Sequence, residues 1–189
     1  MVEDRIIAEG KFIRVVDRDS WEFVDRMGIS GIVVIIGLTS DKEIILVEQL
    51  RIPVGQRVIE LPAGLAGDRP GEEDESFVKA AERELLEETG FEAEEMHFVT
   101  SGPPSPGVTT ESVSFFLALG LRKVGDGGGD ATEDIRTHVV PLDDIENWLA
   151  DAMTRGLLVD PKVYAGLYFC RSHFDTEKET RNGQAREEL

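Results

Sequence analysis

The sequence predicts an α/β protein in which a mixed sheet is flanked by helices and preceded by a small antiparallel sheet. Three observations support this class. Short runs of β-branched and aromatic residues recur along the chain, amphipathic helical patterns are interspersed with them, and Gly- or Pro-rich turns separate the two kinds of segment. Strands and helices that alternate in this way form layers around one hydrophobic core.

The N-terminal region has the pattern of antiparallel strands. Residues 5–26 alternate apolar and polar positions in short runs. We therefore assign residues 1–28 to an N-terminal antiparallel sheet and residues 29–174 to the main domain. Residues 32–38 and 43–48 are β-branched runs joined by a polar turn, which predicts a hairpin in the main sheet.

A helix and further strands are expected after this hairpin. The helix spans about 76–89, and a glycine follows it. Strands are predicted at 97–100, 112–121 and 134–140, with Gly- or Pro-rich loops at 101–107 and 125–133.

The C-terminal part of the chain changes from amphipathic to polar. One helix is expected at 142–154, opened by Asp143 or Asp144, and another at 160–174. Residues 175–189 are almost wholly polar and charged, so we interpret them as a disordered tail that lies outside the core.

Composition limits the classes of function. A chain of 189 residues with 41% apolar residues suits one globular domain, and its formal charge of −18 argues against binding to nucleic acid. The single cysteine, Cys170, excludes an internal disulfide and is expected to be a small buried residue. The start of the chain has no apolar stretch of signal-peptide length, and the apolar run 32–38 is too short to span a bilayer. We therefore expect a cytoplasmic protein without a membrane partner.

The end of the predicted helix 76–89 concentrates negative charge. Glu84, Glu87 and Glu88 lie three and four positions apart, so they share one face of the helix. Such a face repels itself unless a cation is present, and carboxylate oxygens suit Mg²⁺ or Mn²⁺. Taken alone, the run is equally compatible with a solvated acidic surface.

The adjacent side of the same helix is apolar. Val78, Ala81 and Leu85 recur at i, i+3 and i+7 and predict a stripe that packs on the core. The acids would then lie beside the core and not on a free helix.

The surroundings of the acids resemble a known signature. The segment Glu60-Leu61-Pro62-Ala63-Gly64 precedes them, Glu75 stands eight residues before Arg83, and an apolar residue, Phe91, follows Gly90. This pattern resembles the Nudix box. The usual box has five residues between its first Gly and first Glu, whereas ten separate Gly64 from Glu75 here. We interpret residues 68–72 as a loop insertion, which loops tolerate at small entropic cost.

The resemblance implies a Nudix α/β/α sandwich and metal-dependent hydrolysis of a pyrophosphate. It implies Glu84 and Glu88 as leading metal ligands, with Glu87 and the main-chain carbonyl of Ala63 assisting. Arg83 would orient the carboxylates. The metal would be Mg²⁺, with Mn²⁺ as an alternative.

Outside the box, the chain is similar to the ADP-ribose pyrophosphatase branch of this family. Pro106 stands fifteen residues beyond Phe91, as is typical of that branch. The segment 47–51 resembles the stretch in which an arginine, here Arg51, contacts substrate phosphate or ribose. The resemblance also assigns Glu60 to substrate binding.

The N-terminal region adds candidates for recognition of the base. Trp21 and Glu22 resemble a pair that stacks on adenine and forms hydrogen bonds with it. Phe12 is a candidate for the second face of an aromatic clamp, and Arg26 for a phosphate contact. Members of this branch are commonly homodimers that exchange the N-terminal sheet, so Trp21 and Glu22 are expected to complete the partner's site.

A late carboxylate is also expected. The segment 129–138 resembles the loop and strand that bring such a group to the metals, and Glu133 is our candidate. Some relatives carry a catalytic Glu two places earlier, where this chain has Ala131, so Glu133, Asp130 or Glu111 could act as the base. His138 is expected to have a structural role.

The predicted activity is hydrolysis of ADP-ribose or of a related nucleoside diphosphate sugar. Hydrolysis of ADP-ribose would give AMP and ribose 5-phosphate. Three alternatives remain open: hydrolysis of a GDP- or UDP-hexose, a Nudix module that senses ADP-ribose without cleaving it, and an acidic surface that only binds divalent ions. The last two lack turnover, so a substrate panel separates them from the enzyme.

Overall fold

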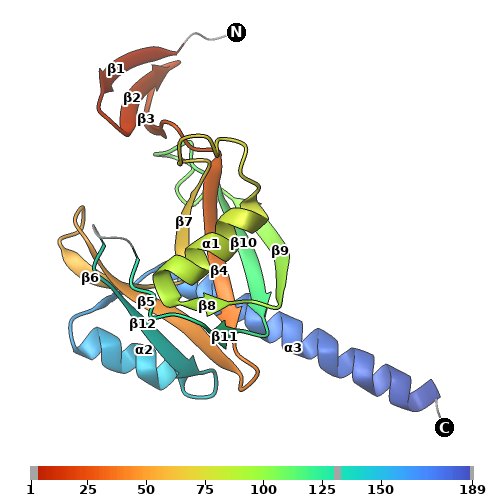
Figure 1. Ribbon diagram of the computed structural model, residues 1–189. Helices are drawn as coiled ribbons and strands as arrows, with labels where there is room; N and C mark the ends of the chain where they lie inside the picture. Colours follow the sequence, from red (N-terminus) through yellow and green to blue (C-terminus); the bar gives the residue numbers. More distant parts are fainter. Residues whose placement is uncertain (1–3, 130–132, 188–189) are drawn as a thin grey trace.

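The structure, a computed structural model, describes residues 4–129 and 133–187. A mixed sheet lies between helix α1 (Phe77–Thr89) on one face and helices α2 (Ile145–Thr154) and α3 (Pro161–Glu187) on the other (Figure 1). Alternate residues of one central strand enter the two cores, because successive side chains of a strand point to opposite faces. Val33 packs with the α1 side and Val34 with the α2 and α3 side. The predicted α/β layered fold is confirmed.

The main sheet combines antiparallel and parallel pairs. Its path is β13-β6-β5-β4-β10-β9, with β12 beside β5 and β7 beside β4; β4 with β10 and β6 with β13 are the parallel pairs. The strands are β4 (Gly31–Leu38), β5 (Glu43–Arg51), β6 (Gln56–Glu60), β7 (Ala63–Ala66), β9 (Glu95–Gly102), β10 (Val113–Leu119), β12 (Ile135–Pro141) and β13 (Leu158–Val159). The short strands β8 (Phe91–Glu92) and β11 (Arg122–Lys123) pair separately.

Strands β4 and β5 form a fork. They pair next to their turn, at Gly37 with Ile45 and Leu38 with Ile44, and then separate. Beyond that point β7 pairs with the first half of β4, and β6 pairs with the second half of β5. The predicted hairpin is therefore correct at its turn, but β6 and β7, which the sequence did not predict, occupy the opening. The link between them is held by the Ile35 N–H, which donates to the Pro62 carbonyl at 2.8 Å.

Helix α1 has the predicted ends. Ser76 caps the N-terminus by accepting a hydrogen bond from the Lys79 N–H, and Gly90 ends the helix in the left-handed conformation with φ 71°. The apolar stripe differs from the prediction at one position. Ala81 and Leu85 are buried, but Val78 is 41% exposed, and Phe77 packs against the core in its place. Ala80 and Glu88 are buried as well, so the buried face of the helix is centred near Phe77, Ala81 and Glu88, and Val78 lies at its edge.

The N-terminal residues form the predicted antiparallel sheet from β1 (Arg5–Glu9), β2 (Ile13–Arg18) and β3 (Trp21–Arg26). This sheet lies at one end of the molecule, apart from α1 (Figure 1). Strand β3 joins it to the main domain, because the Val24 N–H donates to the Val108 carbonyl at 2.8 Å and the Val24 carbonyl accepts from the Thr110 N–H at 3.2 Å.

The last two helices lie where the sequence predicts them, but the second is longer than predicted. Asp144 is the N-cap residue of α2, one of the two candidates. Helix α3 does not end at residue 174; it continues to Glu187, through most of the segment 175–189 for which the sequence predicts a disordered tail. Glu is the commonest residue of that segment, and together with its Arg, Lys, Gln and Ala residues it extends an existing helix at little cost. In the part of the chain that the structure describes, no helix has the length and apolar content needed to cross a bilayer.

A buried ion cluster stabilises the sheet on the side of α2. The Glu48 carboxylate, 6% exposed, accepts a short hydrogen bond from Arg57 and contacts Arg136 at 3.3 Å and His138 Nε2 at 3.1 Å. The ring of His138 also packs on Trp148, with centroids 5.0 Å apart. This geometry agrees with the structural role expected for His138. Burial raises the pKa of Glu48, but hydrogen bonds from Arg57 and His138 and the nearby charges outweigh it and hold the pKa below its ordinary value.

Glu48→Gln is expected to lower the free energy of unfolding by about 2 kcal/mol at pH 7. Because the pKa of Glu48 is depressed in the folded state, its contribution is complete above the unfolded pKa of about 4.3 and is lost as the pH falls through the folded pKa. The difference between variant and wild type should therefore shrink below about pH 4. Urea unfolding at pH 7, 5, 4 and 3 measures it, with Glu92→Gln, which removes an exposed pair with Arg122, as the control. A difference that stays constant with pH would contradict this assignment.

Candidate functional site

Arg83 is the centre of a carboxylate cluster on α1. Its Nε and one NH2 donate to the two oxygens of Glu75, both at 3.0 Å, and the same NH2 donates to the Leu65 carbonyl at 2.8 Å. Its other terminal nitrogen donates to Glu84 at 2.7 Å and to Glu87 at 3.2 Å. The Arg83 side chain is only 15% exposed. Arg83 therefore ties the loop before α1 to the acids of the helix, in the position from which it could orient them.

Glu88 is the most deeply buried acid of the cluster. It is 3% exposed, and one carboxylate oxygen accepts the Ala63 N–H at 3.1 Å. Burial raises the pKa of Glu88 well above its ordinary value; the Ala63 hydrogen bond opposes this shift, and the charges of Glu84 and Glu133 add to it. A buried carboxylate is costly unless a proton or a cation compensates its charge. The resemblance implies a role for the main-chain carbonyl of Ala63, whereas the group of Ala63 that contacts Glu88 in the structure is its N–H.

Glu84 lies over the same piece of backbone. A Cβ atom added to Gly64 would stand 1.9 Å from Cδ of Glu84, so a side chain at position 64 would displace this carboxylate. Burial raises the pKa of Glu84, while the charge and hydrogen bond of Arg83 lower it. Glu84 and Glu88 thus converge on the link between β6 and β7, at the fork of the sheet.

Glu87 is held differently. Arg69, from the insertion 68–72, donates through one terminal nitrogen to both oxygens of Glu87, at 2.6 and 2.7 Å. Within residues 4–129 and 133–187, no three His, Cys, Asp or Glu side chains already surround one metal position. The donors nevertheless fit a hard divalent cation, because Glu84 and Glu88 are confined carboxylates that meet at one place. Glu87 would have to release Arg69 before its carboxylate could bind a metal ion.

Three further predicted residues come to this cluster. Arg51 donates to both oxygens of the buried Glu60 at 2.6 Å, and its charge acts on Glu88 and Glu133. Gln49 Nε2 donates to Glu133 at 3.5 Å. The end of β5 and the start of β12 therefore supply a cation and a late carboxylate next to α1. Asp130, an alternative base, and the neighbouring Ala131 lie outside the described residues.

The other predicted residues do not reach the acids within one chain. Trp21, 68% exposed, and Glu22 lie at the start of β3, next to the turn of the β2–β3 hairpin. Arg26 donates to Glu111 at 2.6 Å, so these two candidates bind each other. Pro106 is exposed in the loop that packs on β3.

An aromatic clamp formed by Phe12 and Trp21 of the same chain is excluded by the register. Trp21 pairs with Arg18 at one end of the β2–β3 hairpin, whereas Phe12 lies opposite Met27 at the other end. The intervening residues span about 20 Å at ~3.3 Å per residue. One purine ring cannot fill that distance, so this interpretation of Phe12 is wrong for a single chain.

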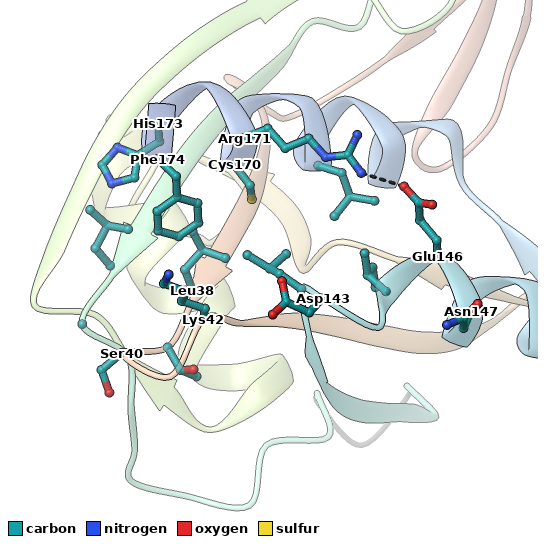
Figure 2. Close-up of a pocket in the computed structure, with 16 residues that line it drawn as sticks. Leu38, Ser40, Lys42, Asp143, Glu146, Asn147, Cys170, Arg171, His173 and Phe174 are labelled. Carbon is teal, nitrogen blue, oxygen red and sulfur yellow. Dashed lines mark hydrogen bonds and ion pairs between the residues drawn. The ribbon is translucent and has the colours of Figure 1, made fainter. Parts of the chain in front are cut away.

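A cavity of about 980 Å³ lies elsewhere in the fold (Figure 2). It is bordered by the β4–β5 turn, the start of α2 and α3, with Lys42, Asp143, Cys170 and Phe174 among its lining residues. Cys170 is buried there as expected, and burial raises the pKa of its thiol to about 12. The cavity opens on the side of the sheet that α2 and α3 cover, so it is not the acidic site on α1.

Two residues near the acids were missed from the sequence. Gln49 is two residues before Arg51 on β5, and the two-residue period of a strand, which puts them on one face, could have identified it. Arg69 belongs to the insertion, where no pattern indicates a partner; only the structure shows it on Glu87.

The fold and the site define a sandwich domain with an acidic helix at the fork of its sheet. Residues 30–158 match the NUDIX domain family, and the chain belongs to this family. It is 40% identical over 88 residues to an ADP-ribose pyrophosphatase of Bacillus subtilis (strain 168), covering 47% of this chain and 45% of that protein. It is 34% identical over 122 residues to a methanol dehydrogenase activator of Bacillus methanolicus, covering 64% of this chain and 63% of that protein.

The chain is also similar to two further proteins. An ADP-ribose pyrophosphatase of Mycobacterium tuberculosis (strain ATCC 25618 / H37Rv) is 40% identical over 98 residues, which cover 50% of this chain and 44% of that protein. The crystal structure of an ADP compounds hydrolase superposes with a TM-score of 0.70 over 93% of each chain at 20% identity, which shows a common fold. The chain spans less than two thirds of the length of these sequence relatives.

Proposed function

We propose that the protein is a Nudix pyrophosphohydrolase that hydrolyses ADP-ribose, or a related nucleoside diphosphate sugar, with a divalent cation. The observation that carries this proposal is the buried Glu88 carboxylate, which lies with Glu84 at the sheet fork and has a raised pKa. The names of two relatives, both ADP-ribose pyrophosphatases, support the substrate. Cleavage of ADP-ribose would give AMP and ribose 5-phosphate.

The proposed metal site consists of Glu84 and Glu88, with Glu87, Glu133 and the Ala63 carbonyl as further donors. When bound, Mg²⁺ or Mn²⁺ would neutralise the pyrophosphate and lower the pKa of a water molecule. Oxygen donors of this type favour Mg²⁺, which is our proposed ion.

The remaining side chains of the site are proposed to orient the carboxylates, bind the substrate and accept a proton. Arg83 keeps Glu84 in place through the 2.7 Å hydrogen bond. Arg51, fixed by Glu60, is the proposed contact to substrate phosphate. Glu133 is the proposed acceptor of the proton from the attacking water. Glu111 suits that role less, because it already pairs with Arg26.

Recognition of the base is proposed to need a second copy of the chain. Trp21 and Glu22 are exposed on β3, and the N-terminal sheet to which β3 belongs lies apart from α1 (Figure 1). A homodimer that places them at the partner's site would use them for adenine, with Arg26 and Pro106 near the same interface. The single cysteine and its burial fit a cytoplasmic enzyme.

A substrate panel tests the activity. ADP-ribose, GDP-mannose, UDP-glucose, NADH and diadenosine polyphosphates are incubated with Mg²⁺ or Mn²⁺, and products are identified by mass. We expect AMP and ribose 5-phosphate from ADP-ribose as the fastest reaction. A faster reaction with a hexose nucleotide would keep the mechanism and change the substrate, and binding of ADP-ribose without turnover of any compound would identify a sensor.

A further inference from the structure

The glycine-rich segment 123–129 covers the C-terminal end of α1. The last carbonyls of a helix have no partner within it, and water usually binds them. Here the Gly129 N–H donates to the Glu87 carbonyl at 3.0 Å and the Gly128 N–H donates to the Glu88 carbonyl at 2.8 Å. Lys123 Nζ donates to the Thr89 carbonyl at 2.7 Å. The segment is therefore attached to the peptide groups that carry two of the acids.

This attachment requires close approach of two backbones. Gly127 has φ 70°, and a Cβ added there would stand 2.4 Å from the Thr89 carbonyl carbon and 2.7 Å from the Glu88 oxygen. On the helix side, a Cβ on Gly90 would stand 2.2 Å from the Gly125 oxygen. Glycine at these positions allows the segment to reach the helix end.

Gly129 has a different neighbour. A Cβ on Gly129 would stand 2.3 Å from Oε2 and 3.0 Å from Cβ of Glu133. The Glu133 side chain thus lies directly against the backbone of Gly129, whose N–H is bound to the Glu87 carbonyl. From this position the charge of Glu133 acts on Glu88 and on Arg51.

We propose that Gly129 is a positioning residue for Glu133. Its missing side chain leaves the space that the Glu133 carboxylate occupies, and its N–H sets the distance of that space from α1. The glycine run is then a spacer that places the late carboxylate of β12 beside the acids of the helix. This inference rests on the proposed function, in which Glu133 serves the metal site or the attacking water.

Gly128 provides a matched control for Gly129. Both residues have positive φ, 107° and 76°, so alanine strains the backbone at either position. A Cβ on Gly128 meets no atom within 4 Å, whereas a Cβ on Gly129 meets Glu133. Gly128→Ala therefore measures strain alone. Gly129→Ala measures strain, displacement of Glu133 and a contact with Ile135 Cδ1 at 2.9 Å, and only the part that displaces Glu133 should depend on the residue at position 133.

The experiment is a double-mutant cycle between Gly129→Ala and Glu133→Gln in the full chain. In the wild-type background, Gly129→Ala is expected to lower kcat for ADP-ribose about 10-fold, since small misplacements of a reacting group have effects of this order. In the Glu133→Gln background it should lower kcat less than about 2-fold, because the group it displaces is already lost. Melting temperatures of both alanine variants show how much of any loss comes from strain at Gly128→Ala and how much Gly129→Ala adds through its contact with Ile135.

A second readout needs no turnover. The affinity for Mn²⁺, measured by electron paramagnetic resonance without substrate, is followed through the same cycle. Coupling between the two substitutions in kcat or in Mn²⁺ affinity supports the proposal, and additive effects in both overturn it. If the wild type hydrolyses nothing in the panel, the proposed function fails, whereas the Mn²⁺ cycle still tests the positioning of Glu133.

Discussion

Glu88→Gln is expected to lower kcat for ADP-ribose by about 100-fold or more. The substitution keeps the shape of the side chain and an oxygen that can accept the Ala63 N–H, but it removes the negative charge. Because Glu88 is 3% exposed, no water shell or mobile side chain can take over its position. Stability should not fall, since burial already disfavours the charged form of this group.

The kinetic measurement is made at saturating Mg²⁺ and again over a Mg²⁺ titration. Glu84→Gln should give a loss of similar size. Glu82→Gln is the matched control, because Glu82 is an exposed acid of the same helix that points away from the cluster. Glu82→Gln should hydrolyse ADP-ribose at the wild-type rate. If a folded Glu88→Gln protein also keeps the wild-type rate, the assigned metal site is wrong.

Arg83→Ala is expected to lower the free energy of unfolding by about 3 kcal/mol in metal-free protein, the scale of a buried ion pair that loses one partner. The change leaves Glu75, Glu84 and Glu87 facing one another without their common cation, and it removes the hydrogen bond to the Leu65 carbonyl. Activity should fall as well, because Glu84 loses the contact that orients it.

Urea unfolding with and without Mg²⁺ measures this effect. Added Mg²⁺ should stabilise Arg83→Ala more than wild type, since the cation replaces part of the lost positive charge. Arg155→Ala is the control; it removes an exposed pair with Asp151 and should change stability by less than about 0.5 kcal/mol. A loss in Arg83→Ala no larger than in this control would mean that Arg83 does not hold the cluster together.

The sequence predicted correctly those helices and strands whose ends and faces depend on residues within the element itself. Helix α1 begins after Ser76 and ends before Gly90, because a hydroxyl cap and a left-handed glycine act within a few residues of each helix end. The strands of the N-terminal sheet follow their alternation. Strands β6 and β7 were missed, because neither is stable without β5 and β4 beside it.

The functional site likewise has a part that local sequence determines and a part that depends on distant residues. The sequence by itself determined the acids of α1, since their spacing puts Glu84 and Glu88 on one face of a helix. Only the tertiary structure decided what surrounds them. The fork of the sheet brings the Ala63 N–H to Glu88, and the glycine-rich segment brings Glu133 to the same place. The Ala63–Glu88 contact joins residues 25 positions apart, and the Gly129–Glu87 contact joins residues 42 positions apart. No periodic pattern within one element can specify contacts at such separations along the chain.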